Sequence, residues 1–255
     1  MQALILAAGE GSRLKDRLER PKCLREVGDV PLLHHQLAAL ADVDVLDVVV
    51  VVGYKQASVR DSVGSWARCV TNERFAETNS MYSFLLGERA ARDDDLLVMN
   101  SDIFCDPRMF QVPFAARGDA LLYDSSSGNE DEQMKVRVRD GVLVEMSKAL
   151  PPDRVSGENV GILRLSRETA AAAADAAADL IAAGRDNAWL AEAINVVAAE
   201  HPIACLDIEG WPWVEIDFPE DLARAREEVF PRVASALEPF SVDHDALVHA
   251  VRRVS

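Results

Sequence analysis

The sequence predicts an α/β fold built on a doubly wound, mixed and mostly parallel sheet, and three observations lead to this prediction. Short runs of aliphatic and β-branched residues, such as VLDVVVVVG at 45–53, show no helical period and are typical of strands covered on both faces. Helical segments alternate with these runs through the first hundred residues. A hairpin pattern and further helices follow, which predict a small β-hairpin and helical lobe beside the sheet.

The first half of the chain supplies most of the predicted parallel sheet. Strands are expected where β-branched and aliphatic residues run together, at Ala3–Ala7, Val45–Val52, Asp95–Asn100, Ala120–Tyr123 and, with a weaker signal, Arg68–Thr71. One helix is expected over PLLHHQLAALA, because Pro31 suits the first helical position. Another is expected over NSMYSFLLGERAA, where Asn79 or Ser80 can cap the first turn.

The second half begins with QMKVRVRDGVLVEMS, which predicts two alternating strands joined at Asp140–Gly141. Further strands are expected in GENVGILRLS, PIACLDIEG and WVEID, and helices in ETAAAAADAAADLIAAG, NAWLAEAINVVAAE and FPEDLARAREEV. The segment 237–255 predicts one more amphipathic helix that packs on the domain or on a partner subunit. No linker composition divides the chain, so we expect a single domain over 1–255 with halves at 1–125 and 126–235 and a helical tail at 236–255.

Composition narrows the classes of partner and compartment. The 255 residues carry 43 acidic and 27 basic side chains, a net charge of -16 that repels nucleic acid and anionic membranes. A phosphate-bearing partner must therefore meet a local basic pocket. The four cysteines are far apart and form no CxxC pair, as expected of reduced thiols. With no signal peptide and no apolar run approaching the roughly 20 residues of a membrane span, we expect a cytoplasmic protein without a membrane partner.

The opening segment, MQALILAAGEGSRLKDRLERPKCL, places a glycine loop after the first strand. A dinucleotide fingerprint needs a third glycine, where this chain has Leu14, and an acid at the end of the second strand, which reads VVGYK. A P-loop motif does not match either. The remaining alternatives are a turn that binds nothing and an anion-binding loop.

Basic residues around this loop favour the anion-binding alternative. Gly9 and Gly11 allow backbone N–H groups to converge on phosphate oxygens. Arg13 would add a bidentate fork, and Lys22 a point charge, for a polyphosphate lying across the strand ends. In a chain this acidic, two such cations beside the loop are better explained by a ligand than by a plain turn.

The motifs along the chain resemble those of a known family. LAAGEGSRL followed by RPKCL is similar to the signature of the sugar-phosphate nucleotidyltransferases, and NSD, GENVGI and WVEID follow in the family's order. NERFAETNSMYSFLLG and the short length most resemble the phosphocholine cytidylyltransferases and related enzymes acting on phosphonates and inositol phosphate. The resemblance implies a Rossmann-like nucleotidyltransferase that uses Mg²⁺ and transfers CMP from CTP to a small phosphate or phosphonate acceptor such as phosphocholine, aminoethylphosphonate or hydroxyethylphosphonate.

The resemblance also implies how the chain is divided. Residues 1–125 would bind the nucleotide and residues 126–235 the acceptor. The expected nucleotide contacts are Leu6, Ala7, Ala8, Gly9, Glu10, Gly11, Ser12, Arg13, Lys22, Asn79, Ser80 and Ser101. Asn72, Asn79 and Ser80 carry groups that could read a base edge and ribose, although helix capping also explains the last two.

Two aspartates are the expected metal ligands. Asp102 follows the strand LLVMN, where open α/β sheets bind their ligands, and Asp217 ends the strand WVEI. Carboxylates from separate strand ends, together with phosphate oxygens and water, form the ligand set that Mg²⁺ prefers. Either aspartate alone could equally be a helix cap or a turn residue. Asp106 and Glu215 match the family pattern less well and are expected to be solvated or capping groups.

The acceptor is expected to contact residues of the second half. By resemblance and by the charge of a dianionic acceptor, these are Lys135, Lys148, Glu158, Asn159 and Trp189, with Arg13, Lys22 and Lys148 as the catalytic cations. Trp189, Trp211 and Trp213 could form an aromatic cage for a quaternary ammonium group. However, the hairpin reads DEQMKV without an aromatic residue, which shifts the expectation from choline toward a phosphonate or another small phosphorylated alcohol.

Two other functions stay open. One is a sugar- or cyclitol-1-phosphate uridylyl- or guanylyltransferase, and the other is a nucleotide-sensing subunit of the same fold without catalysis. A homodimer is compatible with the sequence, which contains nothing that requires one.

Overall fold

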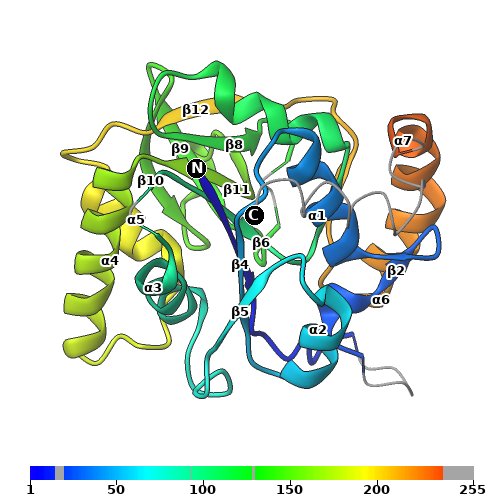
Figure 1. Ribbon diagram of the computed structural model, residues 1–255. Coiled ribbons are helices and arrows are strands. Elements are labelled where there is room, and N and C mark those ends of the chain that lie inside the picture. Colours follow the sequence, from blue (N-terminus) through cyan, green and yellow to red (C-terminus); the bar gives the residue numbers. More distant parts are fainter. Residues whose placement is uncertain (15–19, 93, 128–129, 238–255) are drawn as a thin grey trace.

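A mixed nine-stranded sheet forms the centre of the protein, as seen in a computed structural model that describes residues 1–14, 20–92, 94–127 and 130–237 (Figure 1). The strand order is β5-β4-β1-β6-β11-β8-β12-β10-β9. The first four of these are parallel: β5 (Arg68–Thr71), β4 (Val48–Val52), β1 (Gln2–Ala7) and β6 (Leu96–Asn100). All five valines of β4 are buried, as expected of a strand covered on both faces.

The second half of the sheet is largely antiparallel. Its strands are β11 (Gly157–Leu165), β8 (Ala120–Asp124), β12 (Ala204–Asp207), β10 (Val142–Ser147) and β9 (Lys135–Arg139). β11 runs antiparallel between β6 and β8, whereas β12 is parallel to β8. Because β9 also pairs with the first residues of β11, these five strands close into a ring.

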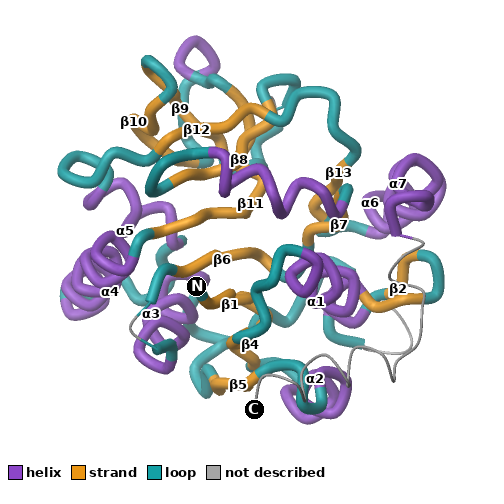
Figure 2. The backbone as a smooth tube through the Cα atoms, turned by 45° about the horizontal axis from the view of Figure 1, so that its top comes forward, coloured by secondary structure: helices purple, strands orange, loops and turns teal. Residues whose placement is uncertain are grey.

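Helices cover both faces of the sheet (Figure 2). On one face lie α1 (Leu32–Asp42) and α2 (Gln56–Val63), and their apolar side chains share a core with β1 and β4 residues such as Ile5. On the other lie α3 (Ser80–Ala90), α4 (Arg167–Ala182) and α5 (Leu190–Val197), which pack against residues such as Leu4. The doubly wound, mixed α/β fold predicted from the sequence is confirmed.

A third apolar cluster anchors the C-terminal helices beside a short two-stranded sheet. The elements are β7 (Ile103–Cys105), β13 (Trp213–Glu215), α6 (Pro219–Arg224), a π-helical turn η4 (Ala225–Val229) and α7 (Phe230–Leu237). β13 pairs antiparallel with β7, and the backbone N–H of Ile216 donates to the carbonyl of Asp102. This pairing brings the segment after β6 next to the segment after β13.

Shorter elements complete the fold. They are the strands β2 (Glu26–Val27) and β3 (Val30–Pro31), and the 3-10 helices η1 (Lys22–Leu24), η2 (Pro107–Ala115) and η3 (Pro152–Arg154). None of the helices in the described residues is long and apolar enough to cross a bilayer.

Most expected elements are present, with shifted boundaries. The strand expected over 45–52 begins at Val48, and the helix after Pro31 begins at Leu32. Asn79 caps α3 as expected, because its Oδ1 accepts a hydrogen bond from the Ser80 N–H. Asp140 and Gly141 both have positive φ, as a tight hairpin turn requires. The expected helical tail falls mainly on residues 238–255, which lie outside the described residues.

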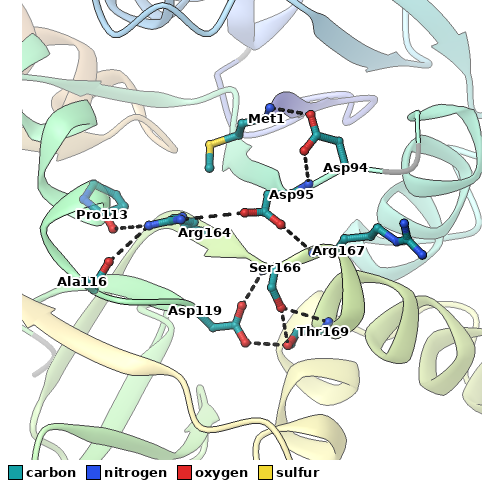
Figure 3. Close-up of polar contacts among 10 residues, drawn as sticks. All are labelled: Met1, Asp94, Asp95, Pro113, Ala116, Asp119, Arg164, Ser166, Arg167 and Thr169. Atoms are coloured by element: carbon teal, nitrogen blue, oxygen red, sulfur yellow. Dashed lines mark hydrogen bonds and ion pairs between the residues drawn. The ribbon is translucent and has the colours of Figure 1, made fainter.

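A polar cluster ties the fold together at the end of β6 away from Asn100 (Figure 3). Arg164 of β11 donates to the carbonyls of Pro113 (3.5 Å) and Ala116 (3.2 Å) at the end of η2. Asp119 accepts hydrogen bonds from the Ser166 N–H and the Thr169 hydroxyl at the start of α4. The cluster therefore joins η2, β11 and α4 at a place remote from the carboxyl ends of the parallel strands.

Candidate active site

One cavity of about 420 Å³ opens at the carboxyl ends of β1 and β6. In open α/β folds, ligands bind at this edge of the sheet, where the parallel strands end. Because β11 runs antiparallel to β6, its first residues, Asn159 and Gly161, lie at the same edge. The cavity thus extends from the glycine loop after β1, across β6, to the hairpin lobe.

The loop after β1 forms one wall of this cavity. Of the twelve expected nucleotide contacts, all but one line it: Leu6, Ala7, Ala8, Gly9, Gly11, Ser12, Arg13, Lys22, Asn79, Ser80 and Ser101. Glu10 is exposed and does not line the cavity. Gly11 has φ +61°, and a Cβ built on it would lie 3.0 Å from the Cβ of Lys22, so the loop and the Lys22 turn fit closely together.

Lys22 lies between the two aspartates expected to bind metal. Its Nζ is 2.6 Å from Asp102 Oδ2 and 2.5 Å from Asp217 Oδ1. Burial lowers the pKa of Lys22, but the two carboxylates raise it by more, so the side chain is an ammonium ion. The other oxygen of Asp102, Oδ1, is buried and accepts no hydrogen bond from any of the described residues. The sequence could not show this three-residue cluster, because the β7–β13 pairing creates it.

Arg13 stands at the mouth of the cavity. Its guanidinium lies 2.9 Å from Glu132 Oε2 and 3.6 Å from Asp217 Oδ2, and 5.2 Å from the centre of the Phe218 ring. Burial raises the pKa of Asp217, but the charges of Lys22 and Arg13 outweigh it, and the net shift is downward. Asp217 is therefore ionised at neutral pH.

Glu215 is a cavity residue that the sequence interpretation assigned to solvent or capping, and that assignment is wrong. β13 directs its partly buried side chain into the cavity, two residues before Asp217. Burial and the neighbouring charges of Asp102 and Asp217 raise the pKa of Glu215 to about 8. The capping role expected for Asp106 is present, since its Oδ1 accepts from the Arg108 N–H at the start of η2.

Side chains expected to contact a nucleotide base also make hydrogen bonds that connect parts of the fold. Asn72 is fully buried, and its amide donates to the hydroxyls of Thr78 and Ser83. The Ser80 hydroxyl accepts from the Leu190 N–H, which joins α3 to the start of α5. Asn72, Thr78, Ser80 and Ser83 all line the cavity.

The other end of the cavity, between the hairpin lobe and α5, is termed here the acceptor end. Lys148 Nζ lies there, 4.6 Å from the centre of the Trp189 ring and 3.6 Å from Glu132 Oε2. Asn159 also lines it, with its Oδ1 accepting from the Gly161 N–H. Glu132 contacts both Arg13 and Lys148, and no sequence signal indicated this role, because the residue belongs to an irregular loop.

The structure can now be compared with known proteins. The family model described as MobA-like NTP transferase domain matches residues 3–204. The chain belongs to this family. The NTP transferase domain is 30% identical over 241 residues to the CMP-5'-(3-aminopropyl)phosphonate synthase of Streptomyces rubellomurinus, covering 88% of this chain and 38% of that protein. It is 33% identical over 135 residues to the choline-phosphate cytidylyltransferase of Streptococcus pneumoniae, covering 51% of this chain and 57% of that protein.

A solved structure shares the fold of this NTP transferase domain. The inositol-1-phosphate CTP transferase from T. maritima matches with a TM-score of 0.76 at 20% identity, over 93% of this chain and 96% of that chain. The predicted superfamily, with its phosphocholine and phosphonate branch, is confirmed. The chain spans only 38% and 57% of the length of these two curated relatives.

Two expected acceptor contacts of the NTP transferase domain lie outside the cavity. Lys135 is buried, and its Nζ donates to the backbone carbonyl of Lys148 at 2.8 Å. Glu158 is buried opposite Lys135 in the β9–β11 pairing and accepts from the Ser127 hydroxyl. Both lie where β9 closes onto β11, a pairing that has no signature in the hairpin sequence, and their role as acceptor contacts stays a prediction.

The aromatic cage considered for choline is not assembled in the NTP transferase domain. Trp213 is buried and donates to Asp124 Oδ2, whereas Trp211 lies beside Arg108. Neither lines the cavity, so Trp189 is the one tryptophan of the three that does.

Proposed function

We propose that the chain is a Mg²⁺-dependent nucleotidyltransferase that transfers CMP from CTP to a small phosphorylated alcohol or phosphonate and releases pyrophosphate. The observation that carries the proposal is the convergence of a glycine loop, Arg13 and Lys22 with the carboxylates of Asp102 and Asp217 in one cavity. CTP as the donor is supported by the names of the phosphonate and choline-phosphate relatives.

The reaction we propose is an in-line displacement. An oxygen of the acceptor's phosphate or phosphonate attacks the α-phosphorus of CTP, and the bond from that phosphorus to the pyrophosphate oxygen breaks. A phosphate-monoester acceptor is already largely dianionic at neutral pH, since its second pKa is about 6, so it needs no general base. The chain's own contribution is then positioning and charge stabilisation.

Three cations of the chain have distinct roles in this proposal. The loop Ala8–Ser12 and Arg13 hold the β- and γ-phosphates that depart as pyrophosphate. Lys22 stabilises the charge that builds on the α-phosphoryl group, and Lys148 holds the acceptor's phosphate or phosphonate.

Asp102 and Asp217 would hold the Mg²⁺ ion. Among the residues that the structure describes, none donates a hydrogen bond to the buried Oδ1 of Asp102, and a cation would satisfy this oxygen. Within the described residues no three His, Cys, Asp or Glu side chains are arranged to hold a metal alone, which suits an ion that takes its remaining ligands from phosphate and water. When bound, Mg²⁺ would supply neutralisation of the phosphate charge.

This metal assignment can be tested with Asp217→Asn. The variant keeps the size of the side chain and removes its charge, so we expect Mg²⁺-dependent turnover to be lost while the circular dichroism spectrum stays unchanged. Activity equal to that of the unmodified protein would refute the assignment.

The acceptor end favours a small acceptor with a hydrocarbon backbone. Its walls are mostly apolar: Leu121, Met134, Met146, Leu163, Leu190, Ala191 and Ile194. Lys148, Asn159 and Glu132 provide the charged and amide groups there. A sugar or cyclitol phosphate would bury several hydroxyl groups against these walls, at about 1–3 kcal/mol for each group left unpaired. The sugar- or cyclitol-1-phosphate alternative is therefore less well supported.

A pyrophosphate-release assay that crosses four NTPs with a set of acceptors tests the proposal. The acceptors are phosphocholine, aminoethylphosphonate, hydroxyethylphosphonate, inositol 1-phosphate and glucose 1-phosphate. We expect release with CTP and one of the first three. Release only with UTP or GTP and a sugar phosphate would support the alternative enzyme, and no release with any pair would support a nucleotide-sensing protein.

A further inference from the structure

The Lys22 ammonium group lies where a cation shared by Asp102 and Asp217 would lie. It contacts one oxygen of each carboxylate, at 2.6 and 2.5 Å. The three side chains are largely buried, with 16%, 15% and 27% of Lys22, Asp102 and Asp217 exposed. Charged groups in such surroundings are stabilised by pairing, so this contact is a substantial one.

Lys22 and a divalent cation compete for the same carboxylate oxygens. A cation held by both aspartates must displace the ammonium group from at least one of them or lie a few ångström from it, where two positive charges repel strongly. Arg13 adds a second positive charge 3.6 Å from Asp217. Free divalent cations therefore meet a site that the chain itself has already neutralised.

The ammonium group of Lys22 can move from the aspartates to another anion while the backbone of Lys22 stays in place. Its backbone is fixed in the η1 turn, and its stem packs against the glycine loop at Gly11. Its ammonium group, in contrast, is at the end of a flexible four-carbon chain. A triphosphate bound at that loop would offer Lys22 an alternative anion. Asp102 and Asp217 would then lose their contact with Lys22 at the moment when the triphosphate brings further negative charge to the site.

We propose that Lys22 is an internal counter-ion that occupies the cation position between Asp102 and Asp217 until a triphosphate arrives, so that a divalent cation binds with the nucleotide rather than before it. The inference rests on the proposed function for the identity of the displacing ligand. The position of Lys22 between the two aspartates in the nucleotide-free protein rests only on the contacts among these three residues.

The test measures Mn²⁺ binding to the nucleotide-free protein, by the electron paramagnetic resonance signal of free Mn²⁺. We expect Lys22→Met to bind Mn²⁺ more tightly than the unmodified protein by at least about tenfold, a modest figure for removing one charge a few ångström from a cation. The matched control is Arg13→Gln, which removes a more exposed charge near the same aspartate and should change Mn²⁺ affinity by less than about threefold. Lys22→Arg should bind Mn²⁺ as weakly as the unmodified protein.

Equal Mn²⁺ affinity in the unmodified protein and Lys22→Met, or an equal gain in Lys22→Met and Arg13→Gln, would overturn the counter-ion inference. If Lys22→Met does not fold by circular dichroism, Lys22→Gln replaces it with the same expected result. A gain in Mn²⁺ affinity in a protein that fails to turn over any NTP would uphold this inference and reject the proposed function. The two failures are therefore distinguishable.

Discussion

Lys22 contacts two aspartates directly, and its removal is expected to affect the chemical step more than binding. In Lys22→Ala, kcat should fall by about 10²–10³, the range seen when one preorganised charge or donor to a transition state is lost. KM for CTP should change much less, because in the proposed function Arg13 and the glycine loop, which line the cavity, would still hold the other phosphates. Steady-state kinetics with varied CTP measure both constants. An unchanged kcat with a raised KM would contradict a transition-state role.

Glu158 offers a pH-dependent test of the fold at the residue scale. Burial raises its pKa from an ordinary 4.5 to about 7, with a further contribution from Asp124. Between these values the folded protein keeps the proton that the unfolded chain releases, so stability should decrease as pH rises from about 4.5 to about 7. Below this window the carboxyl group is neutral in both states and makes no such contribution.

The variant Glu158→Gln should lose this part of the pH dependence. Urea unfolding at pH 5 and pH 8 measures it. Between these two pH values the unfolding free energy should decrease less in the variant than in the unmodified protein, by roughly 1.4 kcal/mol for each pH unit from 5 to the folded pKa of about 7. Equal decreases in both proteins would show that Glu158 ionises normally in the folded state.

At the scale of elements, the loop after β1 contains two glycines with different requirements. A Cβ on Gly9 would meet no atom of the described residues within 4 Å, whereas Gly11 has φ +61° and its Cβ would lie 3.0 Å from the Cβ of Lys22. Gly11→Ala should therefore lower the melting temperature, with a loss of about 1–2 kcal/mol from the left-handed conformation. Gly9→Ala should leave the melting temperature unchanged.

CTP affinity provides the second measurement for this pair of variants. Both glycines line the cavity, so both variants should bind CTP less tightly in calorimetry. The outcome that contradicts this reading is a Gly9→Ala variant as destabilised as Gly11→Ala.

A variant of Arg164 tests whether the polar cluster at the opposite end of the sheet stabilises the fold. Arg164→Met removes the hydrogen bonds to Pro113 and Ala116 and should cost about 1–3 kcal/mol of unfolding free energy, because the two carbonyls lose a charged donor. KM for CTP should not change, since the cluster lies away from the cavity. Arg139→Met is the control: Arg139 is exposed on β9, and its loss should stay within about 0.5 kcal/mol. Equal losses of unfolding free energy in Arg164→Met and Arg139→Met would show that the polar cluster does not stabilise the fold.

At the scale of the whole molecule, the sequence predicted the parallel half of the sheet better than the site. Continuous valines in β4 and the alternation of strands and helices depend on local sequence, and they indicated the fold correctly. The contact of Lys22 with Asp102 and Asp217 depends on the pairing of β7 with β13, which are far apart in the chain. Lys135 and Glu158 were expected as acceptor contacts, and nothing local in the sequence indicates that they are buried where β9 pairs with β11.

The position of β11 has a consequence for how the protein is made. β11 lies between β6 and β8, although both of those strands precede it in the chain. During synthesis on the ribosome, the first 125 residues therefore emerge with β6 and β8 lacking the strand that joins them, and Asp102 emerges long before Asp217. Neither the sheet nor the pair of aspartates can be completed until the last third of the chain has been translated. A truncated product would accordingly expose unpaired strand edges, which are prone to aggregation, rather than act as a half-active enzyme.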